Sequence, residues 1–108
     1  MSATLVSSNT TIKMNAAVSA VGTSSGAGAT TVYTAPAGTF SIVNVYVSHG
    51  ANGSITVGGQ SIAAVSGSSN FNLQGVYIGP SQSLVINSGT LGLSNTAFVS
   101  GVNFTNTP

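Results

Sequence analysis

Few side chains in this sequence are suited to acid–base or metal chemistry. The chain contains no Asp, Glu or Cys, and Lys13 and His49 are its only basic residues. General acid–base catalysis, carboxylate nucleophiles, calcium and magnesium cages and the orienting acid of a hydrolase triad all require a carboxylate. A zinc site needs three or four His, Cys or carboxylate ligands, which one histidine cannot supply within one chain. We therefore expect no enzyme activity, no catalytic or metal-binding residue and no cofactor.

The two basic residues do not change this expectation. Ser and Thr are abundant, but a hydroxyl nucleophile needs an activating base, and only Lys13, His49 or the terminal amine is available. His49 follows an apolar segment and precedes the glycine-containing residues 50–53, so we expect it to be exposed at the end of a hairpin. Ligand binding or pH sensing by His49 is the alternative, through copies gathered around a symmetry axis.

Tyrosine and asparagine supply the remaining candidates for binding. Tyr33, Tyr46 and Tyr77 offer flat aromatic surfaces with a polar end, and we expect them to serve core or interface packing rather than sugar stacking. Three N-x-S/T sequons begin at Asn9, Asn52 and Asn103. We expect no glycosylation of these sequons, because the chain starts without a secretory signal.

Composition points to a neutral component of a larger assembly. The chain has 108 residues, of which 42% are apolar and 1% charged, and its formal net charge is +1. This length and apolar content suit one folded domain with one modest core. A chain with almost no net charge lacks the repulsion that keeps free proteins apart, so we expect it to be held in an assembly as a homo-oligomer.

Nucleic acids and membranes are not expected partners. Both attract clusters of Lys and Arg, which are absent here. No segment reaches the roughly 20 apolar residues of a membrane-spanning helix. We expect a chain made in the cytoplasm without processing.

Alternating apolar residues predict strands throughout the chain. Ile12, Met14, Ala16, Val18 and Ala20 alternate with mostly polar residues, which is typical of a half-buried strand. Phe98, Val102 and Phe104 share the same parity near the other end. The expected strands are 11–21, 30–35, 40–48, 54–57, 61–65, 70–78, 83–87, 90–94 and 97–105.

Turn-forming residues separate these segments. Residues 22–28 are rich in Gly and Ser and predict a flexible loop, and Ser and Gly at 66–69 mark another break. Asn52-Gly53 and Gly58-Gly59 predict hairpins. Pro36 and Gly38 predict a turn with Pro second and Gly fourth, and Gly79-Pro80 opens another turn.

Nine short strands separated by turns predict an all-β protein built as one antiparallel β-sandwich of jelly-roll type. A small closed barrel is the alternative. We expect residues 1–10 to form an extended N-terminal arm, ordered against a neighbouring subunit or a shell protein, and residues 11–108 to form the sandwich domain.

A short internal similarity marks two corners of this domain. Val32-Tyr33-Thr34-Ala35-Pro36 and Val76-Tyr77-Ile78-Gly79-Pro80 share the pattern V-Y-x-x-P. Because Pro fixes φ and cannot donate to a ladder, we expect each segment to be a corner at which one strand ends and the chain turns towards another ladder.

The run TVYTAPAGTFSIVNVYVSHGANGSITVGG resembles a segment of small virion proteins of tailed bacteriophages, in which Tyr-x-x-Pro-Ala-Gly leads into an apolar strand, a polar hairpin and a Gly-Gly turn. GVYIGPSQSLVIN and VSGVNF are similar to later segments of those proteins. Together the resemblance covers most of residues 31–104. It implies a virion structural protein without catalytic residues, on either the capsid or the tail.

We therefore expect a non-enzymatic virion protein that decorates or cements the capsid exterior, with the major capsid protein or another virion protein and its own copies as partners. Two alternatives stay open. One is a tail-fibre or baseplate module that binds a host-surface glycan, and the other is a self-assembling fibre or matrix protein.

Overall fold

The computed structural model of the protein describes residues 11–49, 53–65 and 69–107, and this part of the chain is all-β, as predicted. Its six strands are β1 (Thr11–Thr34), β2 (Thr39–His49), β3 (Gly53–Val57), β4 (Gln60–Val65), β5 (Ser69–Ile78) and β6 (Ser83–Thr107). Among the described residues there is no helix that is long and apolar enough to cross a membrane. The expected N-terminal arm, residues 1–10, lies outside the described residues.

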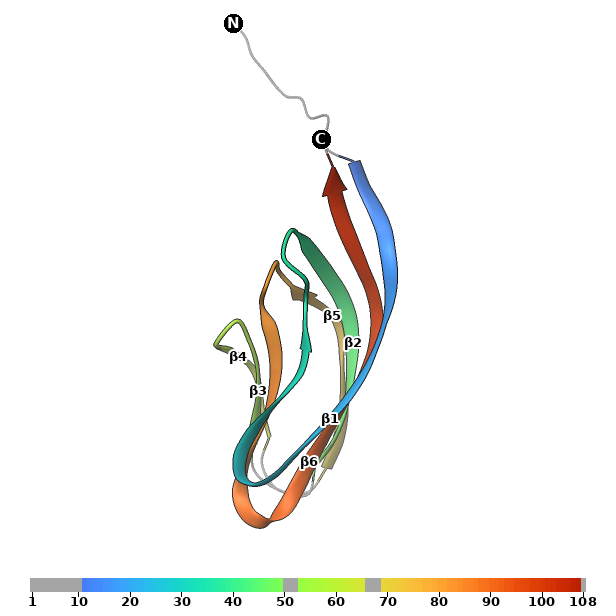
Figure 1. Cartoon of the computed structure of the whole chain (residues 1–108). Helices are drawn as coiled ribbons and strands as arrows, with labels where there is room; N and C mark the ends of the chain where they lie inside the picture. The colour runs from blue at the N-terminus through green and yellow to red at the C-terminus, as the bar shows by residue number, and fades with distance from the viewer. Residues whose placement is uncertain (1–10, 50–52, 66–68, 108) are drawn as a thin grey trace, which may run out of the picture.

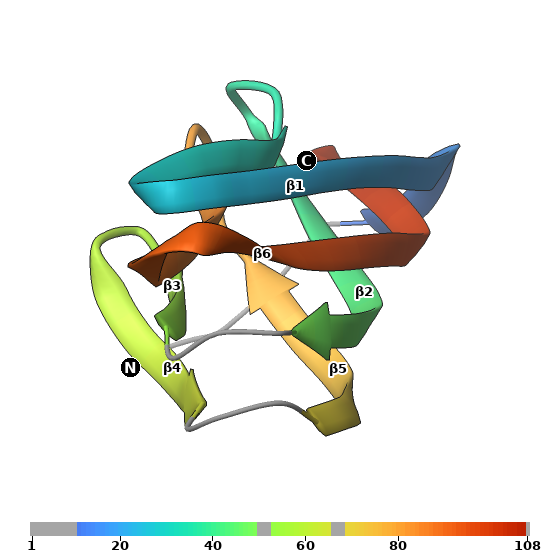
Figure 2. The same ribbon diagram turned by 90° about the horizontal axis from the view of Figure 1, so that it is seen from below.

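Two very long strands organise the fold. β1 and β6 pair antiparallel from Thr11↔Thr107 to Thr34↔Ser83, with an interruption only where the register passes from Ser25↔Ser94 to Ala27↔Gly89. Both strands bend, and the pair therefore runs through two layers (Figures 1 and 2). The first layer has the order β1-β6-β2-β5, and the second has the order β1-β6-β3-β4. The two antiparallel layers pack together as a β-sandwich.

The continuity of these strands corrects the prediction of nine strands. Residues 22–28, predicted as a loop, lie within β1, and the segments predicted at 83–87, 90–94 and 97–105 are all parts of β6. Small residues allow both strands to bend without ending the ladder, as Ser24 pairs with Asn95 and Gly28 with Ser88. The predicted jelly roll is not confirmed, because a jelly roll has eight strands and the described residues form six.

Buried hydrogen bonds close the two bends. In β1 the Ser24 hydroxyl donates to the carbonyl of Gly28. In β6 the side-chain amide of Asn95 donates to the carbonyl of Asn87 at 3.0 Å. Ser24 and Asn95 are each only 1% exposed. These two buried side chains therefore find hydrogen-bond partners in backbone carbonyls across the bends.

The hydrophobic core lies between the layers and is almost entirely aliphatic. It comprises Val18, Ala35, Val43, Val45, Val47, Ile55, Val57, Ile78, Leu84, Ile86, Ala97 and Val99. The alternation predicted near the start of β1 holds for Val18 but is wrong for Ile12 and Met14, which are 62% and 71% exposed. The reason is the bulge between Met14 and Ala16, which places Ile12 and Met14 on the opposite side of β1 from Val18, at an end of the strand that projects past the second layer (Figure 1).

One predicted hairpin is confirmed and the other is wrong. Val57 pairs with Gln60, and Gly58 and Gly59 between them have positive φ values of 59° and 83°. A type I′ hairpin turn requires positive φ at both of these positions. The segment around Asn52 and Gly53 does not join paired strands, because the described residues of β2 and β3 pair with different halves of β6. Gly53 is needed for close packing instead. A Cβ at Gly53 would meet the Asn87 carbonyl oxygen.

The two proline corners lie against each other. The Ala35 amide donates to the Gln82 carbonyl and the Ser81 amide donates to the Ala35 carbonyl, both at 3.0 Å. Each corner carries the chain from one layer to the other, since β1 ends and β6 begins in the second layer while β2 and β5 lie in the first. The interpretation of V-Y-x-x-P as a reused corner is confirmed.

The first turn is shifted by one residue from its predicted register. The Thr39 amide donates to the Pro36 carbonyl at 3.1 Å, which makes Pro36 the first residue of the turn and Gly38 the third. Gly38 has a φ of +77°, as a type II turn requires at this position. In the second corner the Gln82 amide donates to the Gly79 carbonyl at 3.0 Å, so Gly79 opens the turn as predicted.

Gly38→Val should destabilise the domain by about 1–3 kcal/mol, because a β-branched side chain resists positive φ. No atom lies within 4 Å of a Cβ built at Gly38, so the cost is conformational rather than steric. Ala37→Ser is the control and should change stability by less than about 0.5 kcal/mol. Denaturant unfolding measures both, and equal midpoints would contradict the turn geometry.

Candidate functional site

The first layer carries an uncharged, largely apolar surface on the side away from the core. We call this surface the outer face. In β2 the buried Val43, Val45 and Val47 alternate with the exposed Ile42 and Tyr46. The outer face consists of Met14, Ala17, Ser19 and Val21 of β1; Phe98, Ser100, Val102 and Phe104 of β6; Phe40, Ile42, Asn44 and Tyr46 of β2; and Asn72 and Tyr77 of β5.

Strand register arranges these residues in rows across the sheet. The rows are Met14-Phe104-Phe40, Ala17-Val102-Ile42-Tyr77, Ser19-Ser100-Asn44 and Val21-Phe98-Tyr46-Asn72. Two apolar rows therefore lie together at one end, and a polar row separates them from the fourth row. The exposed fractions are large for apolar side chains, reaching 71% at Met14, 60% at Val21 and 56% at Tyr77.

Aromatic rings pack against one another along this surface. The Phe40 ring stacks with those of Tyr77 and Phe104, at centroid distances of 5.6 and 5.2 Å. Tyr46 and Phe98 lie beside each other at 6.0 Å with an angle of 40° between their rings. Such neighbouring rings hold one another in place and form an apolar platform on this surface.

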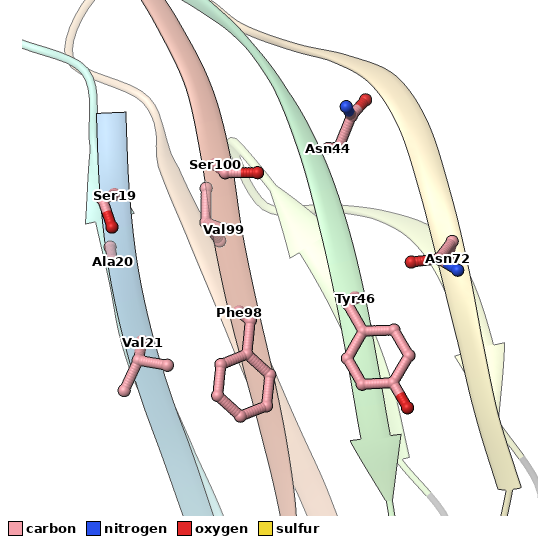
Figure 3. A pocket seen from close by; sticks show the side chains of 9 residues that line it. All are labelled: Ser19, Ala20, Val21, Asn44, Tyr46, Asn72, Phe98, Val99 and Ser100. Atoms are coloured by element: carbon pink, nitrogen blue, oxygen red, sulfur yellow. The ribbon is translucent and has the colours of Figure 1, made fainter. Parts of the chain in front are cut away.

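A groove of about 520 Å³ crosses the outer face at the polar row (Figure 3). Ser19, Ser100 and Asn44 line it on one side, and Tyr46 and Phe98 line it on the other. The Asn44 side-chain oxygen accepts a hydrogen bond from the Gly75 amide at 3.1 Å, which fixes the orientation of the Asn44 amide. The groove therefore presents hydroxyl and amide groups beside two exposed rings.

No charged side chain contributes to the outer face. Lys13, the only Lys or Arg of the chain, is exposed next to Met14 on β1. Because successive side chains of a strand point to opposite sides, Lys13 points away from the outer face. A partner of this surface is therefore selected by apolar contact and neutral hydrogen bonds rather than by charge.

The structure separates the three tyrosines proposed for packing or sugar stacking. Tyr33 is half-buried, packs against the core and shares a hydrogen bond of 2.8 Å with Ser41. Tyr46 and Tyr77 both lie on the outer face, but in different rows. Packing thus accounts for Tyr33, while the other two tyrosines are available to a partner.

The structure describes only part of the remaining sequence candidates. His49 ends β2 and pairs with Asn95 in the ladder, while its side chain lies outside the described residues. The sequon residue Asn103 is only 2% exposed and so cannot be glycosylated in the folded domain. Asn9 and Asn52 lie outside the described residues. The described residues contain no cluster of three His, Cys, Asp or Glu side chains.

Sequence reasoning missed most of the aromatic residues of the outer face. Phe40, Phe98 and Phe104 were assigned to strands without a role, although the alternation of the last strand contained a usable signal. Ala97, Val99 and Gly101 are small, as an inward side pressed against a second layer requires. The larger Phe98 and Phe104 then belong on the outward side.

The fold and the outer face define an all-β sandwich with an uncharged apolar sheet surface. Comparison with known proteins adds no relationship, because no family model matches the chain and no curated protein matches it.

Stability should change little between about pH 3 and pH 5, because acid unfolding arises mainly from carboxylates that are paired in the native state. The sequence has no Asp or Glu, and this range lies below the usual titration of histidine near pH 6.5. Thermal unfolding at fixed concentration checks this expectation. A melting temperature that falls by more than about 10 °C across this range would reveal a titrating partner, since binding also shifts apparent stability.

Proposed function

We propose that this chain is a non-enzymatic structural protein of a tailed-bacteriophage virion, and that it decorates or cements the capsid exterior. The observation that carries the proposal is the outer face, an exposed apolar surface that crosses four strands without a charged residue. Large exposed apolar patches mark interaction surfaces in soluble proteins. The resemblance of residues 31–104 to virion proteins supports the same assignment.

The size of the outer face suggests how such attachment works. Four strands about 4.8 Å apart, over six residues that each rise about 3.3 Å, give a flat area of about 400 Å². If all of that area were apolar, removing it from water would be worth about 10 kcal/mol at 25 cal/mol per Å², and the polar row lowers this upper bound. The loss of translational and rotational freedom on association costs about 4–15 kcal/mol, so one such contact alone is weak.

Repetition turns weak contacts into firm attachment. Once one contact has formed, neighbouring contacts in the same assembly form at a high effective concentration. A protein of this kind adds stability to a shell when many copies bind the major capsid protein, or another virion protein, and one another. The contribution is mechanical and requires no catalytic residue.

A matched pair of substitutions tests the role of the outer face. Ile42 on the outer face is 43% exposed, and Ile62 on β4 of the second layer is 42% exposed. Ile42→Asn should weaken co-sedimentation with particles that lack this protein by about tenfold, equivalent to about 1.4 kcal/mol. Ile62→Asn should bind like the parent protein. Equal binding by both variants would exclude the outer face as the attachment surface.

Electron microscopy of labelled particles then locates the protein. Many copies over the head would support decoration or cementing, and a few copies at the tail would support a tail module instead. Fibres formed by the purified protein without particles would support the third candidate, a fibre or matrix protein.

The groove favours one second candidate, a tail-fibre or baseplate module that binds a neutral glycan. Tyr46 and Phe98 offer rings on which a sugar ring can pack, and Asn44 and Asn72 offer amides near them. A glycan array tests this candidate. Binding that is lost in Tyr46→Ala but kept in Tyr77→Ala would support it, and an array without binding would exclude the glycans tested.

A further inference from the structure

One of the two long strands of the sandwich, β1, has an open edge. Among the described residues, β1 pairs only with β6, so β1 is an edge strand in both layers (Figure 2). An exposed edge carries unpaired N–H and C=O groups that can pair with another strand, and natural proteins usually blunt such edges. The other edges of this protein are β4 and β5.

A bulge interrupts the β5 edge, and the β4 edge is short. β5 carries a bulge opposite Val43 and Val45, where Gly75 has a φ of +67°. β4 has six residues, and the ladder that joins it to β3 is shifted between Ile55 and Thr56. Bulges and short lengths are two of the devices that discourage pairing at an edge.

One segment of β1 lacks all of these devices. The bulges of β1 fall between Met14 and Ala16, between Ser25 and Ala27, and between Thr31 and Tyr33. The regular segment that begins at Ala16 has an unpaired edge as far as Gly22. At the next residue, the Thr23 carbonyl accepts a hydrogen bond from the Thr30 hydroxyl. Lys13, the one charged residue of β1, lies outside this segment on the far side of a bulge.

We propose that two copies of this chain pair through residues 16–22 of β1, antiparallel and about a two-fold axis. The segment suits itself as a partner, since Ala17, Ser19 and Val21 on the outer side and Val18 and Ala20 on the inner side are small and uncharged. Antiparallel pairing of identical segments keeps each side chain on the same face as its opposite. A two-fold dimer is also the commonest form of homo-oligomer.

Pairing of this kind enlarges the outer face. Two four-stranded layers joined at β1 form one sheet of eight strands, and the flat area of the outer face grows from about 400 to about 800 Å². The larger value reaches the roughly 800 Å² that each partner contributes to a standard protein interface. The inference rests on the proposed function in one respect, because the dimer supplies the contact area that one copy lacks for attachment to a shell.

Single cysteines test the pairing directly, because the chain contains no Cys. Ala17→Cys, Ser19→Cys and Val21→Cys are mixed singly and in pairs under mild oxidation. Opposite residues of an antiparallel pair have Cβ atoms about 4.5–5.5 Å apart, close enough for a disulfide, whereas residues further along are not. We expect one register to cross-link efficiently. Gln74→Cys, exposed on β5, is the control and should not cross-link.

Charge on the edge tests the same contact in solution. By sedimentation equilibrium, Ser19→Lys should raise the dimer Kd at least tenfold, because it places two like charges beside each other. Thr31→Lys, exposed on the same strand in the second layer, should leave the Kd unchanged. A parent protein that is monomeric with no cross-link overturns the inference, as does a dimer disrupted by Ile42→Asn but not by Ser19→Lys.

These outcomes are separable from a failure of the proposed function. Loss of particle attachment in Ile42→Asn with an intact dimer would leave the edge pairing standing. A β1 dimer without any particle binding would support the pairing and contradict the virion role.

Discussion

Gly101→Ala should destabilise the domain by at least about 3 kcal/mol, a large share of the roughly 5–15 kcal/mol that stabilises a domain of this size. Gly101 lies in β6 and pairs with Val18 on one side and Val43 on the other. A Cβ at Gly101 would collide with the Ile42 carbonyl oxygen and would lie 2.6 Å from the Val43 Cα atom. Because backbone atoms cannot move aside as a flexible side chain does, β2 and β6 would have to separate.

Thermal unfolding measures this effect against Ser100→Ala, an exposed neighbour on the same strand. The expected loss at Gly101 corresponds to a fall in melting temperature of at least about 12 °C, at roughly 4 °C or more per kcal/mol. Ser100→Ala should shift the melting temperature by no more than about 2–4 °C, since exposed substitutions stay within about 0.5 kcal/mol. A parent-like melting temperature for Gly101→Ala would show that β2 and β6 do not approach so closely.

The short strands could be predicted from sequence almost to the residue. The predicted segments 40–48, 54–57, 61–65 and 70–78 match β2, β3, β4 and β5 within one residue at each end. These strands are defined by alternation of period two and by turn residues next to them in sequence. Such signals are local, and the structure keeps them.

The long strands could not be predicted, because their continuity depends on distant partners. Residues 22–28 have the composition of a loop, but β6 holds them in a ladder through pairs such as Ser24↔Asn95. The side chains that close the bends are also partners in space rather than in sequence, as with Asn95 and the carbonyl of Asn87. Periodicity contains no information on either contact.

The buried side of a strand is equally a property of the whole fold. Alternation places Phe98, Val102 and Phe104 on one side of β6 and Ala97 and Val99 on the other. The side chains of the first set are larger and carry more apolar surface. The structure buries the second set, because the opposing layer leaves room only for small side chains there. Hydrophobicity alone therefore favours the wrong side, and only the small size of Ala97, Val99 and Gly101 indicates the buried one.

The candidate site was unpredictable for the same reason. The outer face joins residues of β1, β2, β5 and β6, and only the order β1-β6-β2-β5 brings Met14, Phe40 and Tyr77 onto one surface. What the sequence did establish is the chemistry of that surface. With one Lys and no Asp or Glu, any surface of this chain must act through apolar contact and neutral hydrogen bonds.

The second large loss of stability is expected at a buried polar network, which lies at the projecting end of the sandwich. Asn103 is 2% exposed, and its amide nitrogen donates to Thr39 Oγ1 at 2.9 Å, Ser41 Oγ at 2.8 Å and the Phe40 carbonyl at 3.2 Å. Its side-chain oxygen accepts from the Asn15 amide at 2.8 Å. One side chain therefore joins β1, β2 and β6 at this end of the first layer.

Asn103→Leu should cost about 2–4 kcal/mol, because the new side chain has a similar size but leaves several buried or half-buried polar groups without this partner. Asn72→Leu, the same change at an exposed position of β5, should stay within about 0.5 kcal/mol of the parent protein. Denaturant unfolding gives both values. A small loss at Asn103 would mean that water replaces its contacts.

A double-mutant cycle with Ser41→Ala separates the hydrogen bond from simple packing. If Asn103 and Ser41 act through the contact at 2.8 Å, the double variant should lose about 0.5–1.5 kcal/mol less than the sum of the single variants. The shortfall arises because the second substitution removes a group that the first has already left without its partner. Strictly additive losses would show that the two side chains contribute independently, and that the contact between Asn103 and Ser41 does not stabilise the domain as described.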